Sequence, residues 1–141
     1  MAFRNAEAVW EGNLQEGHGR MKFGSGAFEG SYSYASRFED GPGTNPEELL
    51  GAAHAGCFSM ALSSGLGKAG YKPVRIFTKA QVKLERVEGK SRITKIHLDS
   101  SAEVPEISAE EFLKIAEATK TGCPVSAALT GVDITLEARL L

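Results

Sequence analysis

The chain has 141 residues, of which 42% are hydrophobic and 24% charged, proportions typical of a soluble globular protein. Its net charge is −2 at pH 7, so the charge balance gives no indication of nucleic acid or an anionic membrane surface as a partner. A chain of this length can bury a sizeable core, and we expect a single domain over residues 1–141.

The N-terminal part is predicted to form a small antiparallel sheet. Alternating side chains separated by turn residues predict three short strands, at residues 4–11, 21–23 and 28–34. Residues 35–43 are polar and rich in glycine, and we expect a loop there. Loops of this kind often carry binding residues.

A long helix of about 20 residues is predicted to start after Thr44 and Asn45. Pro46 suits the first helical position, two glutamates follow it, and no helix breaker occurs before Gly65. Helical spacing predicts an inner face that consists of Leu50, Ala53, Cys57, Met60 and Ser64. Because small or apolar residues occupy almost the whole circumference, we expect this helix to be buried.

The C-terminal part is predicted to contain three strands and two helices. The strands cover residues 74–87, 92–104 and 132–140, with a hairpin turn at 88–90 and a bulge near Thr94. One helix begins after Ser108 and the other at Pro124. The complete order is β-β-β-α-β-β-α-α-β, which predicts an α+β fold with a central helix packed against antiparallel sheets.

Only two cysteines are present, Cys57 in the central helix and Cys123 directly before Pro124. A cysteine at a helix N-terminus is biased toward the thiolate form, whereas a buried one is commonly a small hydrophobic residue. Three alternatives stay open on these residues: a structural disulfide, a catalytic dithiol, or two unconnected core cysteines. The absence of a Cys-x-x-Cys motif or a Cys/His cluster argues against a zinc site, and no cofactor motif is present.

A reactive thiolate needs positive charge nearby, and Arg37 and Arg20 are the candidates. Glu47 is a suitable carboxylate to orient an arginine. Ten residues separate Glu47 from Cys57, about 15 Å along a straight helix. An antiparallel copy of the helix would bring the partner's Glu47 toward Cys57, so if these groups act together we expect a symmetric homodimer with two composite sites.

Several motifs resemble the OsmC branch of the Ohr/OsmC family. They are RFE at 37–39, TNPEEL at 44–49, AAHAGCFSMAL at 52–62 and GCPVS at 122–126, in the order and spacing of that family. The resemblance covers essentially the whole chain. It implies an intertwined homodimer with the OsmC-like fold that reduces organic hydroperoxides, and hydrogen peroxide less well, using its own thiols, no cofactor and an external thiol reductant.

The resemblance also implies roles for individual residues. Cys57 matches the peroxidatic cysteine that becomes a sulfenic acid, and Cys123 matches the resolving cysteine that forms a disulfide with it. Glu47 matches the carboxylate that pairs with the catalytic arginine, and Arg37 matches that arginine. In the Ohr branch the arginine comes from an earlier glycine-rich turn, which the surroundings of Arg20 resemble.

The substrate pocket is expected to include the apolar side chains of Phe38, Phe58 and Met60, which would favour an organic peroxide. Phe112 is a further apolar candidate. His54 lies one turn before Cys57 and could contribute a hydrogen bond. The simpler interpretation is a core histidine with satisfied ring nitrogens, since no carboxylate is evident to orient it.

No apolar run is expected to reach the length of a membrane helix, and the N-terminus lacks the apolar core of a signal peptide, which predicts a cytoplasmic protein. Two rival functions are a non-catalytic stress protein that binds an apolar ligand at the dimer interface and a thiol redox sensor. The first predicts that both cysteines are dispensable. The lack of a basic DNA-binding stretch argues against a regulator of transcription.

Overall fold

The computed structural model describes residues 2–141, which divide into two compact units. The first unit ends at Leu49 and the second comprises Leu50–Leu141. The expectation of a single domain over residues 1–141 stays a prediction.

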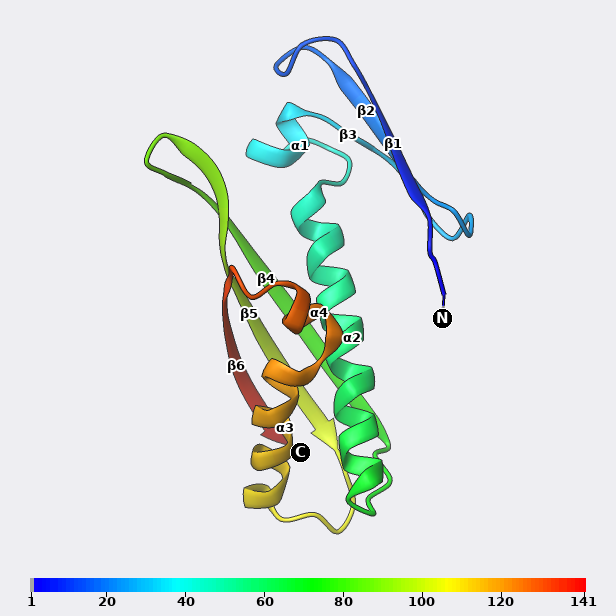
Figure 1. Ribbon diagram of the computed structural model, residues 1–141, viewed down its shortest axis with the longest axis vertical. Helices are drawn as coiled ribbons and strands as arrows, with labels where there is room; N and C mark the ends of the chain where they lie inside the picture. Colours follow the sequence, from blue (N-terminus) through cyan, green and yellow to red (C-terminus); the bar gives the residue numbers. More distant parts are fainter. Residues whose placement is uncertain (1) are drawn as a thin grey trace. The chain divides into compact units, whose positions relative to one another are not determined.

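The first unit contains a three-stranded antiparallel sheet, as predicted. Its strands are β1 (Ala6–Glu11), β2 (His18–Phe23) and β3 (Glu29–Tyr32), with β2 in the middle (Figure 1). A side chain at Gly19 would meet the Tyr32 ring at 2.6 Å and the Trp10 ring at 2.8 Å. The glycine therefore lets these two rings pack across β2, with their centroids 5.3 Å apart.

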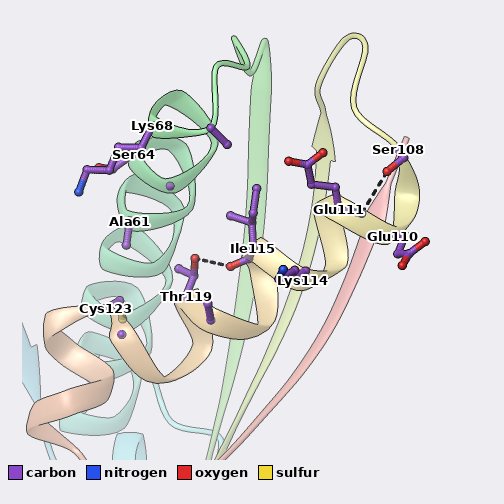
Figure 2. A pocket seen from close by; sticks show the side chains of 14 residues that line it. Ala61, Ser64, Lys68, Ser108, Glu110, Glu111, Lys114, Ile115, Thr119 and Cys123 are labelled. Carbon is purple, nitrogen blue, oxygen red and sulfur yellow. Dashed lines mark hydrogen bonds between the residues drawn. The ribbon is translucent and has the colours of Figure 1, made fainter.

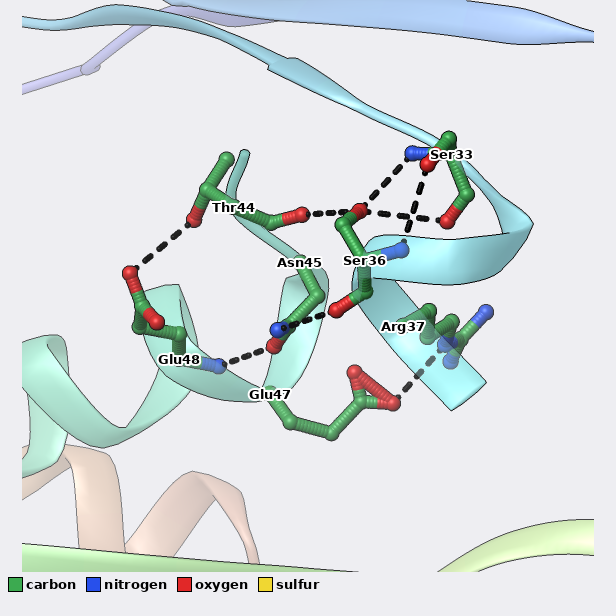
Figure 3. A network of polar contacts seen from close by, with 7 residues as sticks. All are labelled: Ser33, Ser36, Arg37, Thr44, Asn45, Glu47 and Glu48. Carbon is green, nitrogen blue, oxygen red and sulfur yellow. Dashed lines mark hydrogen bonds and ion pairs between the residues drawn. The ribbon is translucent and has the colours of Figure 1, made fainter. Parts of the chain in front are cut away.

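The segment predicted to be a loop contains a short helix, α1 (Tyr34–Phe38), so that prediction is wrong. The side chain of Ser33 accepts the N–H of Ser36, and the side chain of Ser36 accepts the N–H of Ser33 (Figure 3). This reciprocal capping box satisfies two backbone donors at the start of α1. The glycine-rich composition of residues 35–43 gave no indication of this helix.

The long helix α2 (Pro46–Lys68) begins where the sequence predicts. Asn45 provides the cap, because its Oδ1 accepts the N–H of Glu48 at 2.8 Å. The Nδ2 of the same asparagine donates to the carbonyl of Ser36 at 3.0 Å, which ties the start of α2 to α1 (Figure 3).

The second unit contains a mixed three-stranded sheet of β4 (Arg75–Val87), β5 (Lys90–Glu103) and β6 (Asp133–Leu140), with β5 in the middle. Glu88 and Gly89 form the predicted hairpin turn, both with positive φ. The pairing shifts so that Thr94 is the extra residue, which confirms the predicted bulge.

The expectation of purely antiparallel sheets is wrong, because β6 pairs with β5 in parallel. The helices α3 (Ala109–Gly122) and α4 (Pro124–Ala128) connect these two strands. Parallel neighbours need such a crossover, since a short turn cannot return the chain to the same end of the sheet. Ser108 caps α3 and Cys123 caps α4, as predicted.

The core of the second unit lies between this sheet and the two helices α2 and α3 (Figure 1). Its fully buried apolar side chains are Phe58, Leu62, Leu66, Ile96, Leu98, Ala102, Phe112, Ala116 and Cys123. On α3 the buried side chains are those of Phe112, Ala116 and Thr119, whereas Ile115 is only partly buried.

The predicted inner face of α2 is wrong. In the second unit, the buried side chains on this helix are those of His54, Phe58, Leu62 and Leu66, whereas Met60 is 77% exposed. Because small residues surround the helix, two apolar stripes of similar spacing are possible. The ring of Phe58 packs in the core with side chains of β5 and α3, so the stripe that contains Phe58 is the buried one.

The side of α2 opposite the core is exposed, which also corrects the expectation of a fully buried helix. Its exposed residues are Ala52, Ala53, Gly56, Met60, Ser64 and Gly67. By length and hydropathy α2 could even cross a membrane, contrary to expectation. The helix instead packs partly buried in the core of a soluble fold.

Phe112→Ala is expected to lower the free energy of unfolding by about 3–5 kcal/mol, because it leaves a cavity where a fully buried ring contacts α2. Leu113→Ala is the matched control on the same helix, since Leu113 is 47% exposed and should lose far less. Urea unfolding at one fixed protein concentration measures both. Equal losses would contradict this assignment of the core.

Candidate active site

The two cysteines lie near each other in the second unit, on α2 and at the start of α4, and both are free thiols. The sulfur of Cys57 accepts the backbone N–H of Val125 at 3.5 Å. The sulfur of Cys123 accepts the N–H of Ser126 at 3.4 Å, and its thiol donates to the Ser126 hydroxyl at 3.1 Å. Cys123 is fully buried, whereas Cys57 is partly exposed. Backbone N–H groups in the first turn of α4 therefore contact both sulfurs.

His54 joins this cluster through Ser126. Its Nε2 lies 2.7 Å from the Ser126 hydroxyl, and both side chains are buried. Its Nδ1 has no hydrogen-bond partner among the residues that the structure describes, so the expectation of a satisfied core histidine is only half correct. Ser126 was not among the predicted site residues. The available signal was its position two residues after Pro124, where the N–H of a first-turn residue reaches a capping side chain.

Burial sets the protonation of this cluster. Burial raises the pKa of the Cys57 thiol, the Val125 N–H opposes that effect, and the neighbouring Cys123 raises the pKa further. Burial lowers the pKa of His54 below its ordinary value of 6.5, so the imidazole is neutral at pH 7. The Val125 N–H favours the Cys57 thiolate.

The buried His54 predicts that stability falls as the pH decreases through 6.5. Below this pH the histidine is protonated in the unfolded chain but stays neutral in the folded chain. The free energy of unfolding therefore falls by up to about 1.4 kcal/mol per pH unit. Urea unfolding at about pH 7.5 and about pH 5.5 measures the difference, and His54→Gln should reduce it. The same pH dependence of stability in wild type and His54→Gln would show that His54 is not its cause.

In the first unit, Arg37 on α1 and Glu47 in the first turn of α2 form an ion pair. The Nε of Arg37 donates to Oε1 of Glu47 at 2.8 Å (Figure 3). The Glu47 side chain is only 9% exposed, and its Oε2 has no partner in the part of the chain that the structure describes. The guanidinium also lies 5.4 Å from the centroid of the Phe38 ring. Carboxylate and ring together fix the guanidinium plane, and its remaining N–H groups are available to a ligand.

The other predicted site residues have different surroundings. Arg20 on β2 pairs with Glu29 at 3.0 Å on an exposed part of the first unit. Phe38 packs on Tyr34 with ring centroids 4.9 Å apart. Phe58 is fully buried in the core and Met60 is exposed. The structure therefore brings together Arg37, Glu47 and Phe38 in one unit, and the two cysteines and His54 in the other.

A cavity of about 780 Å³ opens between α2 and α3 in the second unit (Figure 2). Ala61 and Ile115 supply apolar surface, whereas Lys68, Lys114 and Glu111 contribute charges of both signs. Among the predicted site residues, only Cys123 lines this cavity. No group of three metal-ligating side chains occurs within residues 2–141.

The OsmC-like protein family matches residues 39–137 of the chain. Over 138 residues the chain is 47% identical to peroxiredoxin OsmC of Escherichia coli, an alignment that covers 97% of this chain and 96% of that protein. The chain belongs to the OsmC family.

Solved structures share the fold of this OsmC-family chain. An OsmC-like protein of Vibrio cholerae superposes with a TM-score of 0.77 at 18% identity, covering 98% of this chain and 99% of the other. The organic hydroperoxide resistance protein OhrB of Bacillus subtilis gives a TM-score of 0.71 at 25% identity, with 95% and 97% covered. The α+β OsmC-like fold predicted from the sequence is thereby confirmed.

Proposed function

We propose that this chain is a thiol-dependent peroxidase that reduces organic hydroperoxides, and hydrogen peroxide less well. The observation that carries the proposal is the pair of free thiols held by one turn of α4, Cys57 by the Val125 N–H and Cys123 by Ser126. The Escherichia coli relative is named a peroxiredoxin, and the Bacillus subtilis protein a hydroperoxide resistance protein. Both names agree with redox chemistry at this pair.

The chemistry follows from the two thiols. The Cys57 thiolate attacks one peroxide oxygen, the O–O bond breaks, and an alcohol leaves once its oxygen takes up a proton. Cys57 is then a sulfenic acid. The sulfur of Cys123 attacks it, water leaves, and a disulfide forms that an external thiol reduces. Partly exposed Cys57 suits the encounter with peroxide, and buried Cys123 suits an internal resolving role.

The Cys57 thiol needs an additional positive group, because its pKa is raised in the single chain. We infer that a second copy supplies it. Glu47 and Cys57 are ten residues apart on α2, about 15 Å at the helical rise, so antiparallel packing of two α2 helices would bring one chain's Arg37–Glu47 pair toward the other's Cys57. The small residues on the exposed side of α2 would permit close approach of the two helices.

Arg37 is a better candidate than Arg20 for this role. Its carboxylate partner Glu47 is nearly buried, so its guanidinium is well oriented, whereas Arg20 and Glu29 are both about half exposed. The exposed side chains of Phe38 and Met60 would then supply apolar surface for an organic peroxide at the dimer interface. A cytoplasmic location would fit two cysteines kept as free thiols.

Anaerobic titration of the reduced protein with cumene hydroperoxide tests the function. One equivalent of peroxide per chain should consume both thiols and produce a Cys57–Cys123 crosslink, identified by mass spectrometry after proteolysis. Thiols that stay reduced under excess peroxide would refute the peroxidase and favour the non-catalytic ligand-binding protein.

A further inference from the structure

Three buried side chains form a continuous hydrogen-bonded chain in the second unit. The Cys123 thiol donates to the Ser126 hydroxyl at 3.1 Å, and that hydroxyl lies 2.7 Å from Nε2 of His54. Their exposed fractions are 0% for the cysteine and the histidine and 3% for the serine. The thiol is therefore shielded from water, and Ser126 connects it to a base.

The direction of these hydrogen bonds follows from the donors available. Because the Ser126 oxygen accepts the thiol proton, its own hydroxyl proton is free to be donated to Nε2 of His54. Nε2 then accepts, and the imidazole proton resides on the buried, unpartnered Nδ1. A buried nitrogen without a partner is costly, which points to a role beyond packing.

We propose that His54 is the proton acceptor for Cys123 during disulfide formation and that Ser126 relays the proton. This inference rests on the proposed peroxidase function. A fully buried thiol cannot pass its proton directly to water, yet its sulfur must be anionic to attack a sulfenic acid. The neutral imidazole, whose pKa burial lowers, has a lone pair at Nε2 to receive the proton.

The step is balanced in atoms and charge. The thiol proton moves to the Ser126 oxygen while the hydroxyl proton moves to Nε2 of His54. The Cys123 sulfur bonds to the Cys57 sulfur, whose S–O bond breaks and releases hydroxide. The hydroxide takes up a proton from solvent and the histidinium later releases one, so the products are the disulfide and one water molecule. The Cys123 sulfur is oxidised and the Cys57 sulfur is reduced.

The test measures two rates separately after rapid mixing of reduced protein with one equivalent of cumene hydroperoxide. Capture with dimedone reports formation of the Cys57 sulfenic acid, and mass spectrometry of quenched samples reports the disulfide. Ser126→Ala and His54→Gln should slow disulfide formation by about 100-fold or more, and the first rate should change far less. The captured sulfenic acid should accumulate accordingly.

Two variants separate proton transfer from simple packing. His54→Gln keeps an amide near the position of Nε2 that can hydrogen bond to Ser126 but cannot accept a proton. Ser126→Thr keeps the hydroxyl and should recover most of the rate lost in Ser126→Ala. Ser59→Ala is the matched control, because it removes a hydroxyl of α2 that bonds Thr78 at 2.8 Å outside the relay. It should leave both rates close to wild type.

Disulfide formation at the wild-type rate in His54→Gln would overturn the proton-acceptor role, and a wild-type rate in Ser126→Ala would overturn the relay. If disulfide formation were slowed equally in Ser126→Thr and Ser126→Ala, with both variants folded by circular dichroism, the relay through the Ser126 hydroxyl would also be refuted. Failure of the wild-type protein to form sulfenic acid would overturn the peroxidase function itself, and is distinguishable because the first rate is then absent.

Discussion

Cys57→Ser is expected to reduce peroxide turnover to background, a loss on the order of 10⁴-fold or more, because a serine hydroxyl cannot be oxidised to a sulfenic acid. The change preserves size, and Cys57 lies only partly in the core, so the fold should be retained. Turnover is measured with cumene hydroperoxide and dithiothreitol. Appreciable residual activity would show that Cys57 is not the nucleophile.

Cys123→Ser is the matched variant, because it removes the second thiol and leaves the first. It should consume one equivalent of peroxide and stop at a sulfenic acid on Cys57 that dimedone captures. The rate of this first oxidation should stay near that of wild type. If instead the variant consumes no peroxide, the two cysteines have been assigned in the wrong order.

Arg37→Ala is expected to slow formation of the sulfenic acid on the order of 10²- to 10³-fold, because it removes the cation proposed to stabilise the thiolate and the developing charge on the peroxide. It also leaves Glu47 nearly buried without its partner. Arg20→Ala is the control, since Arg20 pairs with Glu29 on an exposed surface and should change the rate little. The reverse order of effects would favour Arg20 as the catalytic arginine.

Mixed dimers test the proposed homodimer, in which each site uses both chains. Cys57→Ser and Arg37→Ala protein, each nearly inactive alone, are unfolded together and refolded. If the arginine acts on the partner's cysteine, half of the dimers are mixed, each has one intact site, and about one quarter of wild-type activity returns. If arginine and cysteine act within one chain, no combination contains an intact site and no activity returns.

Local signals predicted the elements that position the site. Helix starts after Asn45 and after Ser108, Pro124 at a first helical position, and a hairpin turn within residues 88–90 are each recognisable within a few residues. The bulge at Thr94 was visible as a change in the parity of apolar residues. Such features depend on backbone geometry that neighbouring residues determine, so sequence alone suffices for them.

The chemistry-bearing residues were also recognisable as candidates, but their partners were not. Cys57, Cys123, Arg37 and Glu47 stand out by residue type and position along the chain. The bond between His54 and Ser126 joins residues 72 apart in sequence, and no local pattern predicts it. The two cysteines were thus recognisable as candidates from the sequence, whereas the buried polar chain around them was not.

By itself, the sequence determined the order of strands and most helices, the helix caps and the two candidate thiols, because these follow from local backbone preferences and residue chemistry. Only the tertiary structure decided which side of α2 is buried, that β6 runs parallel to β5, and that Ser126 links Cys123 to His54. The physical reason is that these features depend on packing between distant segments. A stripe of small residues carries too little periodicity to specify that packing in advance.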